Sequence, residues 1–284
     1  MNEAFKQLKT YLDEAMAVQT ALVLFEWDDA TLAPKAAGEN TSRVIEILSG
    51  QYFKAMTGDE TKALVRQCLQ DPSGLNEVEL AQVKEMEEQI GQLDCIPKEE
   101  YQAFAKLSSE SVRIWEEAKE QNDFKRFAPT LKKVVEYQKK FASYRAKEGQ
   151  SKYDALLKDY EKGFTTTDLD EFFGLLKEEL VPFLKEVMEK GRQICDDFLT
   201  GTFPEEKQEE LGRFLADYVG FDFSKGVLSV SAHPFTTNLH NKDVRITTSY
   251  NDHVDSSLFS VIHEAGHGIY EMGIRDDLTQ TVVG

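Results

Sequence analysis

Apolar residues recur along most of the chain at the spacing of three and four residues that is typical of amphipathic helices. No glycine interrupts residues 92–148, and the two prolines there, Pro97 and Pro129, stand where helices are expected to begin. The same periodicity predicts shorter helices over residues 3–24, 41–56, 60–70, 76–93 and 205–219. The pattern therefore predicts a mainly α-helical fold.

The longest apolar stripe runs from Leu169 to Phe198 and follows three threonines at residues 165–167. A stripe of this length along one side of a helix is expected to face a core. We therefore predict that its side chains are buried and do not form a ligand surface.

The pattern changes after Gly220. The segments Val227–Ala232 and Asp243–Tyr250 alternate between apolar and polar residues as strands do, which predicts a small β-hairpin beside the helix that follows. We expect a helical body over residues 1–220 and the start of a catalytic region over residues 221–284, continuous with the body as one domain.

Neighbouring side chains on the second of these strands point to opposite faces of the sheet. One face carries Val244 and Ile246, and the other carries Asp243, Arg245 and Thr247. The polar face is expected to border a substrate groove, because the strand lies close in sequence to the chemical motif described below.

Composition narrows the functional classes. The chain has 51 acidic and 33 basic residues and a formal net charge of −18, which disfavours binding to nucleic acid. No apolar run approaches the roughly 18 residues that a membrane helix needs, so we expect no membrane partner. The three cysteines are widely spaced and form no CxxC pair, which indicates a reducing, cytoplasmic location.

The strongest chemical signal is an HExxH motif formed by His263, Glu264 and His267. On a helix, histidines four residues apart lie on one face, so both imidazoles can bind one metal ion. The glutamate then lies beside that pair, where it can act as the general base on a water molecule. This arrangement predicts a zinc-dependent hydrolase that cleaves amide bonds.

The residues around the motif favour a metal site over a chance match. All five histidines of the chain lie after residue 232. An apolar stripe on the opposite face of the same helix would pack against a core and turn the ligands into a cleft; it consists of Leu258, Val261, Ile262, Ala265, Ile269 and Met272.

A catalytic zinc ion needs a third protein ligand, and the motif does not supply one. Glu271 lies a full turn beyond His267 on the same helix, so we interpret it as a supporting residue. Asp276 and Asp277 are weaker candidates. We expect the third ligand to be a glutamate beyond Gly284, which would make the 284-residue chain an incomplete and inactive fragment.

The segment His233-Pro234-Phe235 precedes the polar strand and is separated from it by a predicted turn that contains Asn238, Asn241 and Lys242. A hairpin edge beside the metal helix could bind an extended peptide as an added strand. His233, Asp243 and Arg245 are therefore candidate substrate-binding residues. The alternative is that Asp243 and Arg245 form only a local ion pair.

These motifs resemble those of the carboxypeptidase Taq family, which are helical zinc metallocarboxypeptidases. The family signatures HPF, DxRxT and HExxH occur here in the same order, as His233-Pro234-Phe235, Asp243/Arg245/Thr247 and His263/Glu264/His267. Further similar segments lie at Trp27-Asp28 and at Tyr153-Asp154-Ala155-Leu156, so the resemblance covers nearly the whole chain.

The resemblance implies a helical fold with a deep groove, one zinc or cobalt ion per subunit, release of C-terminal amino acids from peptides, and a homodimer. The family motif HES/GQ, which supplies the third metal ligand, does not occur in this sequence. Two other functions stay open: an oligoendopeptidase of the related helical HExxH type, or a non-catalytic helical binding protein that keeps a vestigial motif.

Overall fold

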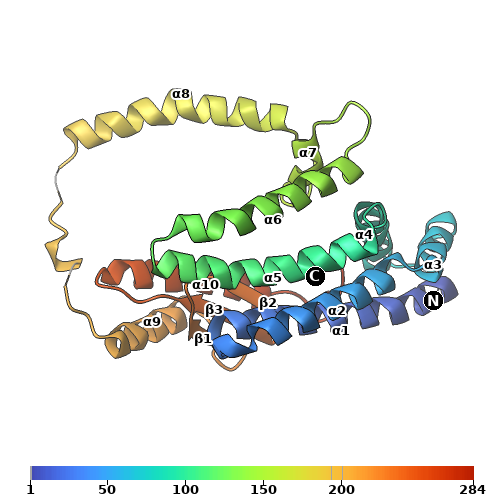
Figure 1. The fold of residues 1–284 in the computed structure, drawn as a ribbon, viewed down its shortest axis with the longest axis horizontal. Helices are drawn as coiled ribbons and strands as arrows, with labels where there is room; N and C mark the ends of the chain where they lie inside the picture. The colour runs from blue at the N-terminus through green and yellow to red at the C-terminus, as the bar shows by residue number, and fades with distance from the viewer. Residues whose placement is uncertain (1, 193, 200) are drawn as a thin grey trace. The chain divides into compact units, whose positions relative to one another are not determined.

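The structure is a computed structural model that describes residues 2–192, 194–199 and 201–284. Helices dominate it, as the periodicity predicts, and three short strands lie near the C-terminal end (Figure 1). Its elements, in chain order, are α1 (Glu3–Thr31), η1 (Lys35–Ala37), α2 (Gly38–Thr57), α3 (Asp59–Gln70), α4 (Glu77–Leu93), α5 (Lys98–Glu120), α6 (Phe124–Arg145), α7 (Lys152–Leu157), α8 (Thr166–Lys190), η2 (Asp197–Leu199), α9 (Glu205–Val219), β1 (Gly226–Val230), β2 (Thr236–His240), β3 (Asp243–Thr248) and α10 (Val254–Met272).

The two prolines predicted to begin helices behave differently. Pro97 directly precedes α5, as expected. Pro129 instead lies inside α6, which already begins at Phe124, so that prediction was wrong. Pro129 cannot donate a hydrogen bond to the carbonyl of Lys125 and its ring crowds that carbonyl, but the residues before it keep their own N–H groups, so the first turn of α6 can still be helical.

Contacts between residues divide the chain into two compact units. One consists of Met1–Leu131 together with Leu199–Gly284, and the other of Lys132–Phe198. The first unit contains α10 and all three strands and therefore carries the predicted chemistry. No helix in the described part of the chain is long and apolar enough to cross a membrane.

The prediction that the Leu169–Phe198 stripe is buried was wrong. No residue of α8 is buried, and the side chain of Phe183 is 62% exposed. The periodicity correctly predicted a helix with an apolar side, but it carries no information about which surface covers that side.

The N-terminal helices of the first unit pack around one core. α1 lies against α2 and α3, and α2 lies against α5 (Figure 1). The buried side chains that join α1 to α2, α3 and α4 include Phe5, Leu8, Met56, Val65, Val83 and Met86.

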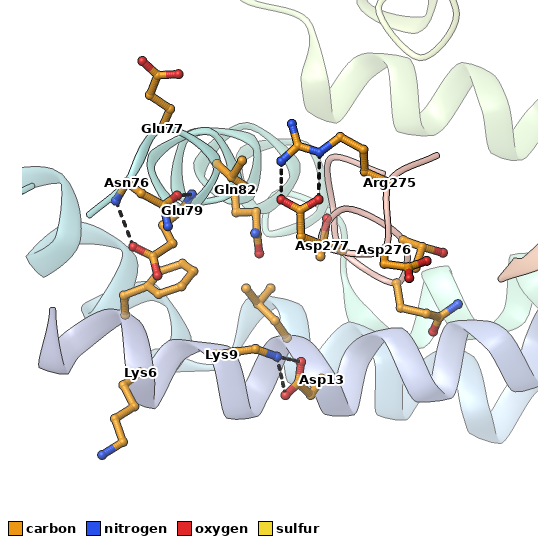
Figure 2. A pocket seen from close by; sticks show the side chains of 16 residues that line it. Lys6, Lys9, Asp13, Asn76, Glu77, Glu79, Gln82, Arg275, Asp276 and Asp277 are labelled. Carbon is orange, nitrogen blue, oxygen red and sulfur yellow. Dashed lines mark hydrogen bonds and ion pairs between the residues drawn. The ribbon is translucent and has the colours of Figure 1, made fainter. Parts of the chain in front are cut away.

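A cavity of about 850 Å³ opens between the start of α1, the start of α4 and the C-terminal segment of the chain (Figure 2). Two of its cations, Lys9 and Arg275, are paired with neighbouring carboxylates. Lys9 binds Asp13 at 2.5 and 2.8 Å, and Arg275 binds Asp277 through two of its nitrogens. Asp276 and Asp277, the weaker candidates for a metal ligand, line this cavity, whereas His263, Glu264 and His267 do not.

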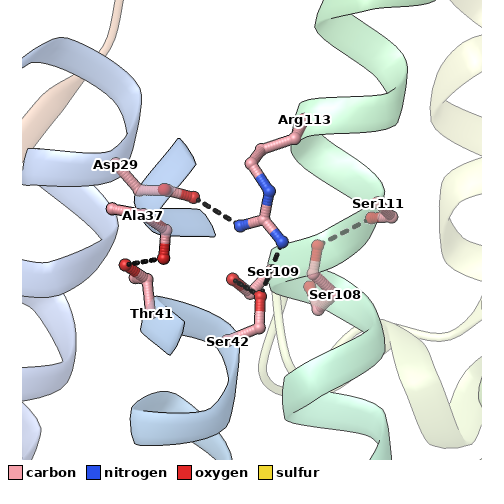
Figure 3. A network of polar contacts seen from close by, with 8 residues as sticks. All are labelled: Asp29, Ala37, Thr41, Ser42, Ser108, Ser109, Ser111 and Arg113. Carbon is pink, nitrogen blue, oxygen red and sulfur yellow. Dashed lines mark hydrogen bonds and ion pairs between the residues drawn. The ribbon is translucent and has the colours of Figure 1, made fainter. Parts of the chain in front are cut away.

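A polar network connects α1, α2 and α5 (Figure 3). The guanidinium of Arg113 donates to Asp29 at 3.1 Å and to the hydroxyl of Ser42 at 2.8 Å, and Ser42 in turn contacts Ser109 at 3.0 Å. A cation that is largely removed from water needs such partners. A Cβ atom at Gly38 would lie only 2.4 Å from Nε of Arg113, so glycine provides the space for this side chain.

The sheet has the order β1-β3-β2. β1 pairs with β3 in parallel, and β2 pairs with β3 in an antiparallel hairpin. The sequence predicted a strand close to β1 and a strand close to β3, but it missed β2. Asn238 was assigned to a turn and lies inside β2 instead, because asparagine favours turns but tolerates a strand when its amide has a partner.

A second core fixes α10 against the sheet and α9. It is built from six buried residues, Ala216, Phe221, Leu228, Ile246, Val261 and Ala265. Val244 and Ile246 are both fully buried, as the alternation along this strand predicts. The prediction that Ile262 belongs to the apolar stripe that packs against the core was wrong, since its side chain is 37% exposed.

Gly268 on α10 makes a tight contact in this core. A Cβ atom there would lie 2.6 Å from a ring carbon of Phe221, which is 1% exposed, whereas a Cβ at Gly266 would meet nothing within 4 Å. We expect Gly268→Ala to lower the free energy of unfolding by about 1–3 kcal/mol through overpacking. Gly266→Ala is the matched control and is expected to raise it by up to about 1 kcal/mol, since alanine favours helix.

Denaturant unfolding of the two variants measures this difference. Equal unfolding midpoints for the two alanine variants would contradict the tight contact between α10 and Phe221.

Candidate functional site

The two motif histidines converge on one point of the exposed side of α10. Nε2 of His263 lies 3.2 Å from Nε2 of His267, and the two rings are nearly perpendicular, at 87°. Two nitrogens bound to one tetrahedral zinc ion at ~2.0–2.1 Å would lie about 3.3 Å apart. The observed separation therefore fits two ligands of one divalent ion.

Glu264 follows the first histidine but lies on a different side of the helix. Its side chain is 7% exposed and points toward β2. Oγ1 of Thr236 lies 2.5 Å from Oε2 of Glu264 and 3.1 Å from the main-chain oxygen of the same residue. The bond to Thr236 directs this carboxylate toward β2, and the carboxylate forms no three-residue metal-binding group with the two histidines.

Glu271 lies two turns beyond Glu264 on α10. Its carboxylate accepts a hydrogen bond from the side-chain amide of Asn238 on β2. β2 thus contacts two acidic side chains of α10, one through Thr236 and one through Asn238.

No third ligand completes the histidine pair within the described residues, where no group of three His, Cys, Asp or Glu side chains could hold a metal ion. Asp276 accepts hydrogen bonds from Asn241 at 2.8 Å and from Lys242 at 3.1 Å, and these bonds hold the pKa of its carboxyl below the ordinary value. Asp277 is bound by Arg275.

Thr247 fastens the His-Pro-Phe segment to the sheet. Its fully buried hydroxyl accepts a hydrogen bond from the main-chain N–H of Phe235 at 2.9 Å, and its own N–H donates to the Phe235 carbonyl at 2.9 Å. The hydroxyl of Ser231 lies 2.7 Å from both Thr247 Oγ1 and the carbonyl of His233. The side chain of His233 stays exposed at the end of this segment.

Arg245 and Asp243 form a two-point ion pair along β3. Nε and one terminal nitrogen of Arg245 donate to the two carboxylate oxygens at 2.9 and 3.0 Å. The guanidinium also lies 4.7 Å from the ring centre of Trp27 on α1, a distance at which a cation is attracted to an aromatic face. Since β3 is the central strand, a peptide could add only to the outer edges of β1 or β2.

Sequence analysis missed three residues of this site. Trp27 was noted only as part of a family resemblance, and Thr236 and Asn238 were given no role. Their contacts join segments that are distant in the chain, so no local spacing indicates them. The one available signal was the position of Thr236 directly after the His-Pro-Phe segment.

Comparison with known proteins identifies the family of this chain. The sequence model of the carboxypeptidase Taq (M32) metallopeptidases matches residues 7–284. Carboxypeptidase 1 of Bacillus subtilis is 38% identical over 267 residues, which are 92% of this chain and 52% of that protein. The chain thus spans about half the length of the curated relatives it matches.

Solved structures agree with this match. The crystal structure of BsuCP superposes with a TM-score of 0.95 at 34% identity, covering 99% of this chain and 56% of that one. The carboxypeptidase of Pyrococcus furiosus superposes with a TM-score of 0.87 at 30% identity, covering 100% of this chain and 57% of that one. The chain therefore belongs to the carboxypeptidase Taq (M32) metallopeptidase family.

Proposed function

We propose that this protein is a metal-dependent carboxypeptidase that releases amino acids from the C-terminal end of peptides. The observation that carries the proposal is the pair of converging imidazoles on α10, together with the carboxylate of Glu264 on the same helix that Thr236 holds in place. Family membership and the names of the relatives support the same reaction.

His263 and His267 would hold one divalent ion, which we propose is zinc or cobalt. Imidazole nitrogens suit either ion, and their 3.2 Å separation fits two positions of a tetrahedral site. When bound, the ion supplies a Lewis acid that polarises the scissile carbonyl and acidifies water. We propose that the third protein ligand comes from outside the described residues, among which no third candidate joins the pair.

Glu264 would act as the general base. Its Oε2 accepts a hydrogen bond from the hydroxyl of Thr236. No donor from the described residues reaches Oε1, so a water molecule can bind to that oxygen. Oε1 takes a proton from the attacking water, and the same carboxyl then delivers the proton to the leaving amine. One residue thus serves both proton transfers of amide hydrolysis.

We propose that His233, Asp243 and Arg245 contact the peptide. Asp243 occupies Nε and one N–H of Arg245, so other N–H groups of the guanidinium stay available for a carboxylate. A free carboxylate is the group that distinguishes the end of a peptide from its interior. Arg245 could therefore contribute to the selection of C-terminal residues.

The products formed from a peptide with a blocked N-terminus test this function. We expect the metal-loaded, full-length gene product to give a series of fragments that each lack further C-terminal residues, detected by mass spectrometry. The same peptide with a C-terminal amide is the matched control and should resist cleavage. Internal cuts would instead show an oligoendopeptidase, and intact peptide would favour a binding protein.

A further inference from the structure

We propose that Thr236 is a positioning residue for the general base, acting through a hydrogen bond that fixes the orientation of the Glu264 carboxylate. This inference rests on the proposed function of Glu264. Its observation is independent of the motif: Oγ1 of a threonine on an edge strand lies 2.5 Å from Oε2 of a glutamate on α10.

The register of the sheet directs Thr236 toward α10. Thr236 pairs with Ile246, and Asn238 pairs with Val244. Residues opposite each other on neighbouring strands share a face of the sheet. Both apolar partners are fully buried, and Ile246 belongs to the core shared with α10, so Thr236 and Asn238 are on the face that α10 covers.

The hydroxyl of Thr236 has one hydrogen and two acceptors within reach. These are Oε2 of the Glu264 side chain at 2.5 Å and the main-chain oxygen of Glu264 at 3.1 Å. A hydrogen bond to an ionised carboxylate is shorter and stronger than one to a neutral carbonyl. The side chain is therefore the favoured acceptor, and the bond restricts rotation of the carboxylate about its last torsion.

A second contact fixes the strand that carries Thr236. The amide of Asn238, two residues along β2, donates to Glu271, which lies seven residues after Glu264 and thus on nearly the same side of α10. β2 is consequently bound to the helix at two points. These two hydrogen bonds restrict movement of β2 along α10 and so keep Thr236 in position next to Glu264.

Removing the hydroxyl of Thr236 tests its proposed role in positioning Glu264. Thr236→Val keeps the shape of the side chain but removes the donor, and we expect kcat to fall about 10- to 100-fold, the range typical of losing a residue that orients a metal ligand. KM and the bound metal should stay unchanged, since neither the histidines nor the peptide contacts are altered. Thr236→Ser restores the donor and should recover most of the lost kcat.

Two controls separate positioning from loss of stability. Thr57→Val removes a threonine hydroxyl that donates to a main-chain carbonyl inside α2, away from the site, and should leave kcat unchanged. If Thr236→Val does not fold, Thr236→Ala removes the same donor without adding an apolar branch. Its kcat is then compared with that of Thr236→Ser at equal metal content.

The outcomes distinguish this inference from the proposed function. A wild-type kcat in Thr236→Val, a rise in KM without a fall in kcat, or equal losses in the valine and serine variants would overturn the positioning role. Retained hydrolysis in Glu264→Gln would instead overturn the proposed general base. An inactive Glu264→Gln together with a fully active Thr236→Val would reject the inference alone.

Discussion

Replacing Glu264 with glutamine is expected to lower kcat by ~10²–10⁴-fold, the usual contribution of a positioned general base. Glutamine keeps the size of the side chain and an oxygen that can accept from Thr236, but it cannot take a proton from water. Both histidines are unchanged, so the variant should bind as much metal as the wild type. Steady-state hydrolysis of a blocked peptide and metal analysis of the same sample measure the two quantities.

Glu271→Gln is the matched control for this experiment. It makes the same substitution on the same helix, two turns away, and its oxygen can still accept from Asn238. We expect it to keep most of the wild-type kcat. Equal losses in the two variants would show that the effect comes from the charge of the helix and not from proton transfer by Glu264.

The centre of the site could be predicted from the sequence because it depends on one local geometry. The four-residue spacing of His263 and His267 brings both rings to one side of any regular helix, and the structure shows their Nε2 atoms 3.2 Å apart. The alternation of Asp243–Thr248 was equally informative, since strand geometry alone separates Val244 and Ile246 from the polar side chains.

The surroundings of the site could not be predicted, because they depend on which segments meet. β2 contains Asn238, which suggested a turn, and it is stabilised as a strand by its pairing with β3 and its contacts with α10. The contact of Trp27 with Arg245 joins the first helix to the central strand. For α8, the sequence correctly predicted the helix, but the predicted burial of its apolar side was wrong.

Removal of either histidine is expected to abolish stable metal binding. Loss of a residue that only orients a ligand typically costs 10- to 100-fold in metal affinity, so loss of a direct ligand should cost more. We expect His263→Ala and His267→Ala to retain no metal after dialysis, while His240→Ala, a histidine on the β2–β3 hairpin, retains the wild-type amount. Metal analysis by mass spectrometry after dialysis measures all three.

The same measurement tests whether a carboxylate of the described residues serves as the third ligand. Asp276 is held by Asn241 and Lys242, and Glu271 is held by Asn238, so both carboxylates already have partners away from the histidine pair. Asp276→Asn and Glu271→Gln should therefore retain the wild-type amount of metal in the full-length gene product. If either variant lost its metal as the histidine variants do, that carboxylate would be the third ligand, and its observed hydrogen bonds would have to break when the ion binds.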